Sequence, residues 1–226
     1  MSRAEWLARR QRAWGCSDLP ALWLAAGLAD ADTAPSYIKQ RVSVPRGHKT
    51  QRLILEKAGL IDARSAGGAA ARGTEREREL LTQYREHVRR GQLPGPMADS
   101  LQHADTVPNE WLPLVDRECS RLACTPDAWG RDALGLLYAV EIKCSVTERP
   151  ELPWYWALQL QGEMACMNAD GGWLVCGEHW ASHHGQDGPI RAWEVERDDA
   201  LIGRIREVCG TYWETVETAK KDAGND

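Results

Sequence analysis

A strand–helix–strand pattern between residues 134 and 178 restricts the fold of this 226-residue chain more than any other feature. Residues 138–143 read YAVEIK within an apolar segment, 134–144, and this pattern predicts a β-strand. Residues 154–168 predict a helix, and the apolar run at 172–178 predicts a second strand. The pattern therefore predicts an α+β protein with a central mixed sheet flanked by helices.

Additional elements surround this unit. The further predicted strands are 98–107, 111–116, 119–124 and 190–196. The further predicted helices are 3–14, 19–26, 51–58, 74–90 and 197–220. The segments 30–50 and 62–71 are rich in Pro, Gly or Ala and are predicted to be loops.

The length and composition bound the class of protein. A chain of 226 residues fits one domain, 1–226, with a helical N-terminal part at 1–60 and a C-terminal helix and tail at 197–226. The net charge of −5 argues against a polycationic coat for nucleic acid, so any such contact is expected to be a local basic patch. The sequence shows neither a signal peptide nor an apolar run long enough to span a membrane, which predicts a cytoplasmic protein without membrane partners.

The cysteines give no recognisable metal motif. Seven are present, none in a C-x-x-C pair, and their spacings fit neither a zinc ribbon nor an iron–sulfur cluster. We interpret them as scattered, reduced thiols.

The strand at 138–143 carries the residues with the clearest chemistry. Side chains at i and i+2 share one face of a strand, so Glu141 and Lys143 point the same way and Ile142 points into the core. Asp127 follows Pro126 at a distance that suits a hairpin. Two converging carboxylates can hold Mg²⁺, and a lysine beside them can orient a water, which is the minimum needed for metal-assisted phosphodiester hydrolysis. The alternative is a Glu/Lys pair on a solvated strand face.

Two helices contribute further polar candidates. Glu77 lies in a charged helix, where a solvated surface is the simplest interpretation. Gln159 and Gln161 lie within the apolar segment ALQLQ at 157–161, either as functional residues that face the core or as the wet side of the helix.

The order of four short motifs resembles a known family. RGTERE at 72–77, CTPD at 124–127, VEIKC at 140–144 and ALQLQ at 157–161 are similar to motifs of the PD-(D/E)XK nuclease superfamily. Within it, the chain most resembles the phage lambda exonuclease and YqaJ viral recombinase family, over about residues 10–167. The resemblance implies a restriction-endonuclease-like core. The sequence departs from the S-P-D-G of many members in having T-P-D-A at 125–128.

The resemblance also implies roles for single residues. The implied catalytic residues are Lys143, Glu141, Asp127, Glu77 and Gln159. The implied metal ligands are Asp127, Glu141, Glu77 and the carbonyl of Ile142. Residues implied to bind the 5′-phosphate or the DNA are Arg10, Ser17, Thr125, Arg149 and Gln161.

The activity implied by the resemblance is a 5′→3′ exonuclease. It would use Mg²⁺, or Mn²⁺, without an organic cofactor, and would degrade one strand of linear double-stranded DNA to mononucleotides. The 3′ overhangs would serve single-strand annealing recombination, with an annealing protein as partner. Members of the family form homotrimeric rings and come from bacteria, phages or prophages.

Other interpretations of the sequence stay open. The nearest is another PD-(D/E)XK endonuclease or repair nuclease with the same metal chemistry. A non-catalytic helix-turn-helix DNA-binding protein is the next, with residues 17–42 as the motif and Gly27 at its turn, although Pro35 interrupts its second helix. A Cys/His metal module around His183 and His184 has no cysteine pair near it.

Overall fold

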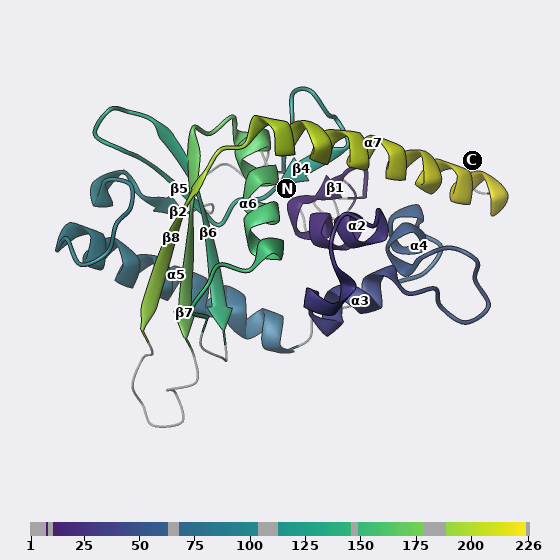
Figure 1. Ribbon diagram of the computed structural model, residues 1–226, viewed down its shortest axis with the longest axis horizontal. Coiled ribbons are helices and arrows are strands. Elements are labelled where there is room, and N and C mark those ends of the chain that lie inside the picture. The colour runs from purple at the N-terminus through teal and green to yellow at the C-terminus, as the bar shows by residue number, and fades with distance from the viewer. Residues whose placement is uncertain are drawn as a thin grey trace.

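The computed structural model describes residues 8, 11–62, 68–103, 113–145, 149–178 and 189–224, with only the backbone of 68–75. Its centre is a five-stranded sheet in the order β2-β5-β6-β7-β8 (Figure 1). The strands are Gln102–His103, Ala128–Arg131, Leu137–Ser145, Gly171–Glu178 and Ile190–Glu196, respectively. β6 and β7 are parallel and the other pairs are antiparallel. The predicted mixed sheet of an α+β protein is therefore confirmed.

Two helices cover opposite faces of this sheet. α6 (Trp154–Met167) connects β6 to β7, as a parallel strand pair requires. α5 (Gly68–Arg89) packs on the other face, where its Leu80 and Tyr84 form one core cluster with Val140 and Ile142 of β6. Alternate residues of β6 thus face different helices, which sets the direction of every functional side chain on this strand.

A second, smaller sheet joins the N-terminal part to the centre. It has the order β1-β4-β3, with β1 at Trp14–Gly15, β4 at Leu122–Cys124 and β3 at Leu114–Val115. β1 is parallel to β4 and continues into the short 3-10 helix η1 (Cys16–Asp18). This pairing places the start of the described chain beside α6.

The remaining helices form a layer next to α6 (Figure 1). They are α2 (Leu19–Ala25), α3 (Ser36–Val42), α4 (Arg52–Ala58) and α7 (Asp199–Asp222), with the short 3-10 helix η2 (Ala31–Thr33). A further 3-10 helix, η3 (Ala98–Ser100), contacts α5 and β5 instead. α7 leaves the end of β8 and runs across α2 and α4. Buried residues of these helices join α6 and β7 in one large hydrophobic cluster.

Several predicted boundaries were wrong. Trp14, predicted to be helical, lies in β1 because its fully buried ring packs in the core. The predicted loop 30–50 contains α3, and Pro35 caps that helix rather than interrupting it. The predicted loop 62–71 is helical from residue 68, and 63–67 lie outside the described residues. β5 was missed because Gly130 and the polar Arg131 weaken its strand pattern.

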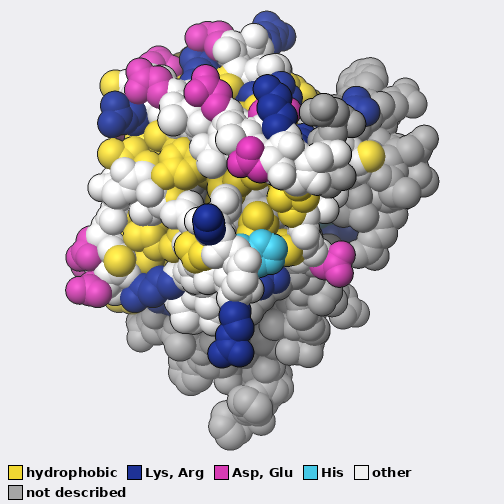
Figure 2. All heavy atoms as spheres, turned by 90° about the vertical axis from the view of Figure 1, so that its right-hand side faces the viewer, with side chains coloured by type: hydrophobic (Ala, Val, Ile, Leu, Met, Phe, Trp, Pro, Cys, Tyr) yellow, Lys and Arg dark blue, Asp and Glu magenta, His cyan; other side chains and the backbone are white. Residues whose placement is uncertain are grey.

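The surface agrees with an acidic chain of mixed charge. On the face shown in Figure 2, Lys and Arg side chains lie among acidic and apolar ones and form no continuous stripe. Within the described part of the chain, no helix combines the length and the apolar character needed to cross a membrane.

Candidate active site

The hairpin of β5 and β6 brings the two predicted metal-binding acids together. Asp127 directly precedes β5, and the register pairs Ala128 with Val140, so Asp127 lies across from Glu141. The Asp127 Oδ2 accepts a hydrogen bond of 2.8 Å from the backbone N–H of Ile142. This bond fixes the carboxylate of one strand against the backbone of the other.

Lys143 and Gln159 complete a hydrogen-bonded ring with Glu141. The Lys143 Nζ donates to Glu141 Oε1 and, at 3.2 Å, to Gln159 Oε1. The Gln159 Nε2 donates to the same Glu141 oxygen at 2.5 Å. Glu141 and Lys143 therefore face α6, while Ile142 packs on the α5 side, as the strand pattern predicted.

Glu163 is a further acid in this group that the sequence reasoning did not select. It lies one turn after Gln159 on α6, and its Oε1 accepts a hydrogen bond of 2.9 Å from Gln159 Nε2. The side chain is 1% exposed, and no donor among the described residues reaches its Oε2. A charged residue four positions after Gln159 in an apolar helix is the signal that would have found it.

If all the acids of this group were ionised, they would carry more negative charge than their neighbours offset. Burial, and then the Glu141 carboxylate, raise the pKa of Asp127 well above its ordinary value of 3.8. Burial and the charges of Glu141 and Asp127 also raise the pKa of Glu163 well above 4.5. Burial opposes the charge of Lys143, but Glu141 and Asp127 outweigh it and raise the Lys143 pKa above 10.5. Lys143 is therefore a permanent cation among several carboxylates.

Glu77 lies close enough to this group to interact with it electrostatically. It is a half-buried residue of α5. Burial, followed by the charge of Glu141, raises the Glu77 pKa, while the charge of Lys143 lowers it. The structure thus places Glu77 beside the site rather than on a fully solvated helix face.

A small pocket opens beside Gln159 and contains two of the predicted phosphate ligands. The exposed side chains of Ser17, at η1, and Thr125, after β4, both line it, because β1 and β4 are neighbours. Its full lining is Ala13, Gly15, Cys16, Ser17, Pro113, Ala123, Cys124, Thr125, Gln159 and Glu163. The pocket therefore adjoins the carboxylate–lysine group through Gln159 and Glu163.

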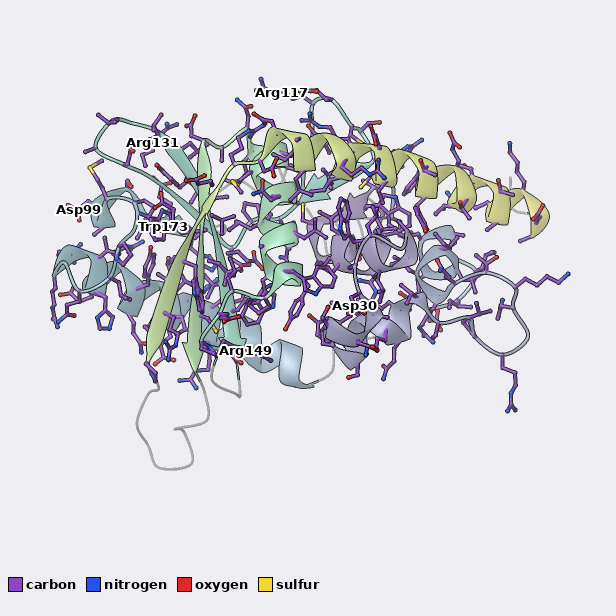
Figure 3. All side chains as sticks on the ribbon, in the orientation of Figure 1. Asp30, Asp99, Arg117, Arg131, Arg149 and Trp173 are labelled. Carbon is purple, nitrogen blue, oxygen red and sulfur yellow. The ribbon has the colours of Figure 1, made fainter. Side chains whose placement is uncertain are left out.

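Arg149 lies near the site but outside this pocket. Its Nε donates to Ser145 Oγ at 3.4 Å, and its guanidinium lies 5.8 Å from the ring of Trp156, one turn before Gln159. Figure 3 shows Arg149 near the carboxyl end of β6. Arg10 lies outside the described residues.

Gln161 is not part of the candidate site. It is 4% exposed, its Nε2 donates to the Glu196 carbonyl at 2.7 Å, and its Oε1 accepts from the Asp198 N–H at 3.0 Å. Residues two apart on a helix point in different directions, so Gln161 joins α6 to the chain between β8 and α7. The structure therefore does not bring Gln161 together with the other predicted site residues.

The cysteines are less scattered than the sequence suggested. The Sγ atoms of Cys16, Cys124 and Cys166 lie within 4.8 Å of one another. All three are free thiols. His183 and His184 lie outside the described residues.

The donor set of the carboxylate group fits a hard divalent cation. Asp127, Glu141 and Glu77 offer oxygen ligands, which Mg²⁺ prefers. The raised pKa values of Asp127 and Glu77 have mutual repulsion among their causes. A bound divalent cation would remove that repulsion, so the residues present suit the metal that the family resemblance implies.

Comparison with known proteins rests on structure alone. No protein-family model matches the sequence, and no match to a curated protein sequence was found. An alkaline exonuclease, LHK-Exo, from Laribacter hongkongensis aligns with a TM-score of 0.64 and 17% identity, over 98% of this chain and 96% of that one. A phage-related exonuclease from Haemophilus somnus 129PT aligns with a TM-score of 0.57 and 12% identity, over 93% of this chain and 96% of that one. The chain therefore shares the fold of these exonucleases, with a restriction-endonuclease-like core.

Proposed function

We propose that this chain is a metal-dependent deoxyribonuclease that degrades one strand of linear double-stranded DNA from its 5′ end. The observation that carries the proposal is the convergence of Asp127, Glu141, Lys143 and Gln159 at one point of the β5–β6 hairpin and α6. The similarity of the whole fold to two exonucleases supports it.

The residues of the site have distinct roles in this proposal. Lys143, which is charged at neutral pH, orients the attacking water and offsets negative charge that develops on the phosphate. Gln159 holds Lys143 and Glu141 in register through its two hydrogen bonds. The Ile142 N–H keeps the Asp127 carboxylate turned toward Glu141.

Asp127, Glu141 and Glu77, with the carbonyl of Ile142, would hold Mg²⁺ or Mn²⁺. When bound, the metal supplies Lewis-acid polarisation of the phosphate and a water of lowered pKa. Glu163 lies behind Gln159 and is proposed to keep its amide oriented.

The pocket beside Gln159 supports attack from the 5′ end. The Ser17 and Thr125 hydroxyls line it and are proposed to donate to a terminal 5′-phosphate. Arg149, which lies over the ring of Trp156 on α6, is proposed to contact the same phosphate. LHK-Exo has been crystallised with dAMP, a mononucleotide, and this complex aligns with a TM-score of 0.59 and 18% identity over 99% of this chain and 98% of that one. We therefore propose mononucleotides as products and 3′ overhangs as the remaining ends.

The deciding experiment compares DNA ends and topology with Lys143 present or absent. The substrates are linear duplexes with a 5′-phosphate or a 5′-hydroxyl, and the same DNA as a closed circle, all with Mg²⁺. Lys143→Ala is compared with Lys221→Ala, an exposed lysine near the end of α7. We expect mononucleotide release from 5′-phosphate ends by wild type and Lys221→Ala, and a loss of about 10²–10³-fold in Lys143→Ala.

Each other outcome would contradict a different part of the proposal. Cleavage of the closed circle would identify an endonuclease with the same metal chemistry. DNA binding without cleavage, unchanged in Lys143→Ala, would favour the helix-turn-helix interpretation. Equal rates on 5′-phosphate and 5′-hydroxyl ends would remove the phosphate pocket from the proposal.

Assembly and recombination partners follow from the family resemblance rather than from contacts in this chain. A homotrimeric ring around DNA would explain processive digestion by an acidic protein. Sedimentation equilibrium tests the trimer, and co-purification of a single-strand annealing protein encoded beside this chain tests the partner.

A further inference from the structure

Three thiols that are far apart in the sequence meet beside the pocket. Cys16 lies in η1, Cys124 ends β4 and Cys166 lies in the last turn of α6. The parallel register pairs Gly15 with Ala123, so Cys16 and Cys124 are the next neighbours along the two strands. α6 approaches them closely at Gly162, where an added Cβ would lie 2.9 Å from Cys16 Sγ. The packing of three elements thus gathers the sulfurs.

The spacing of the sulfurs suits a metal better than a disulfide. All three Sγ atoms lie within 4.8 Å of one another. Three thiolates on a tetrahedral Zn²⁺, with Zn–S bonds of about 2.3 Å, lie roughly 3.8 Å apart, so small side-chain movements complete the geometry. A disulfide needs sulfurs about 2.05 Å apart and would leave the third thiol unused.

The surroundings provide both access and a favourable charge. Cys16 and Cys124 line the pocket whose exposed residues include Ser17 and Thr125, so an ion can enter from solvent. Glu163 lines the same pocket, is 1% exposed, and has no donor at Oε2 among the described residues. Glu163 and Cys166 are three residues apart and share a face of α6. Glu163 thus places a carboxyl oxygen, which no donor in the described part of the chain reaches, beside the pocket, where a bound cation would favour its ionised form.

We propose that Cys16, Cys124 and Cys166 form a Zn²⁺ site with three sulfur ligands, whose fourth position opens into the pocket. Binding deprotonates the thiols and releases their protons to solvent. The site is separate from the oxygen ligands of the carboxylate group, and it does not depend on the proposed nuclease function. Soft thiolates select Zn²⁺ over Mg²⁺, so the two sites discriminate between the metals.

The test uses Cd²⁺ as a spectroscopic probe of sulfur ligation. The reduced chain is titrated anaerobically with Cd²⁺ in excess Mg²⁺, which competes for oxygen ligands but not for thiolates, and the sulfur-to-metal charge-transfer band is recorded in the ultraviolet. Zn²⁺ is then added to displace the probe. Cys166→Ser removes one ligand. Cys119→Ser is the matched control, because Cys119 is equally half-buried but its Sγ contacts the Arg206 carbonyl.

We expect one Cd²⁺ per chain in wild type and Cys119→Ser, displaced by Zn²⁺, and at least about 10-fold weaker binding in Cys166→Ser, as is usual for loss of a contact that supports a metal. Circular dichroism and the unfolding midpoint of the metal-free variants establish that the fold is kept. A missing band, a band unchanged in Cys166→Ser, or one lost only in Cys119→Ser would each overturn the proposal. Loss of two free thiols on air oxidation, without uptake of Cd²⁺, would identify a disulfide pair instead.

Discussion

Two buried groups of charged side chains differ in how their charges are balanced. Asp18, 4% exposed, accepts a hydrogen bond of 2.9 Å from the Gly15 N–H and pairs with Arg41 at 2.7 Å and Lys57 at 3.0 Å. Glu56 lies 3.9 Å from Arg41 and is a second acid of this group, so two acids there meet the two cations, and a backbone donor adds a hydrogen bond. This group joins η1 to α3 and α4, and its balanced charges serve the fold.

The group at the β5–β6 hairpin has the opposite balance. Glu141 and Glu163 are buried, Asp127 adjoins them, and Lys143 is the cation hydrogen-bonded to the group within the described residues. Ionising all of these acids together is unfavourable without a further cation, which is why their pKa values are raised and why the group suits a divalent cation. The comparison teaches that a buried acid with matched partners indicates structure, whereas acids in excess indicate chemistry.

The sharpest way to break this comparison is to remove one acid from each group and measure both properties. Glu141→Gln should lower the proposed DNA cleavage by about 10³-fold, because a proposed metal ligand and the partner of Lys143 are lost together. Its free energy of unfolding should not fall, because surplus charge is removed. Glu214→Gln, an exposed substitution on α7, is the control for both measurements. A variant that unfolds but keeps its specific activity would reverse our assignment of the two groups.

Asp18→Ala should have the converse effect. It removes the carboxylate that pairs with both Arg41 and Lys57 and leaves Arg41 with the more distant Glu56, at 3.9 Å. We expect this loss to cost about 3 kcal/mol of unfolding free energy in urea. Cleavage per folded molecule should be unchanged. Asp99→Ala is the matched control, because Asp99 pairs with Arg89 at a similar 2.8 Å but is 90% exposed (Figure 3). Equal stability losses in the two variants would contradict the contrast between buried and exposed pairs.

Mg²⁺ should stabilise the fold by binding to the carboxylates of the β5–β6 hairpin. A cation at 100 times its dissociation constant adds about 2.7 kcal/mol to the unfolding free energy if it binds only the folded state. Thermal unfolding with and without Mg²⁺ measures this gain. The gain should disappear in Asp127→Asn. It should persist in Asp18→Ala when each variant is compared with its own stability without Mg²⁺. A gain of the same size in Asp127→Asn would place the ion elsewhere.

The crowding of acids at the β5–β6 hairpin should also make the free energy of unfolding depend on pH. The pKa of Glu163 is raised above 4.5 by burial and by Glu141 and Asp127, so above pH 4.5 the folded state binds more protons than the unfolded state. Its contribution to stability is therefore lost as the pH rises from 4.5 through the raised pKa. Urea unfolding is measured across this pH range with a chelator present to remove metal ions. The free energy of unfolding should fall less steeply with rising pH for Glu163→Gln than for wild type. Parallel curves would mean that Glu163 does not titrate with folding.

The smallest effect is expected at the pocket. Thr125→Val removes one hydroxyl and should reduce the preference for 5′-phosphate over 5′-hydroxyl ends several-fold, corresponding to about 1 kcal/mol for one hydrogen bond. Thr125→Ser keeps the hydroxyl and should keep the preference. Initial rates on the two kinds of end measure it, and a preference retained by Thr125→Val would exclude this contact.

The sequence predicted the central unit well because its signals are local. The alternation at 138–143 correctly placed Glu141 and Lys143 on one face, and the apolar helix and strand that follow were found within a few residues. Trp14 failed because burial between distant elements overrides a helical pattern. The strand β5 is too short and too polar at its end to be recognised without its partner β6.

The site was predictable to the extent that its residues lie in motifs. Asp127, Glu141, Lys143 and Gln159 were found because they belong to short ordered segments, and the structure brings them together. Glu163 was missed because a charged residue four positions after Gln159 in an apolar helix was not interpreted as a buried acid. The thiol group was missed because β1 and β4 pair only in the folded chain.

The pairing of β1 with β4 also determines when the site can exist during folding. Contacts around it join parts of the chain more than a hundred positions apart, as in the bond from Arg121 Nη1 to the Arg12 carbonyl, 109 residues away. Such long-range closures cost loop entropy and form slowly, whereas the β5–β6 hairpin and α6 are local. The carboxylates can therefore meet early, but the pocket closes only when the N-terminal segment docks. The carboxylates would then lie together before the pocket beside them exists.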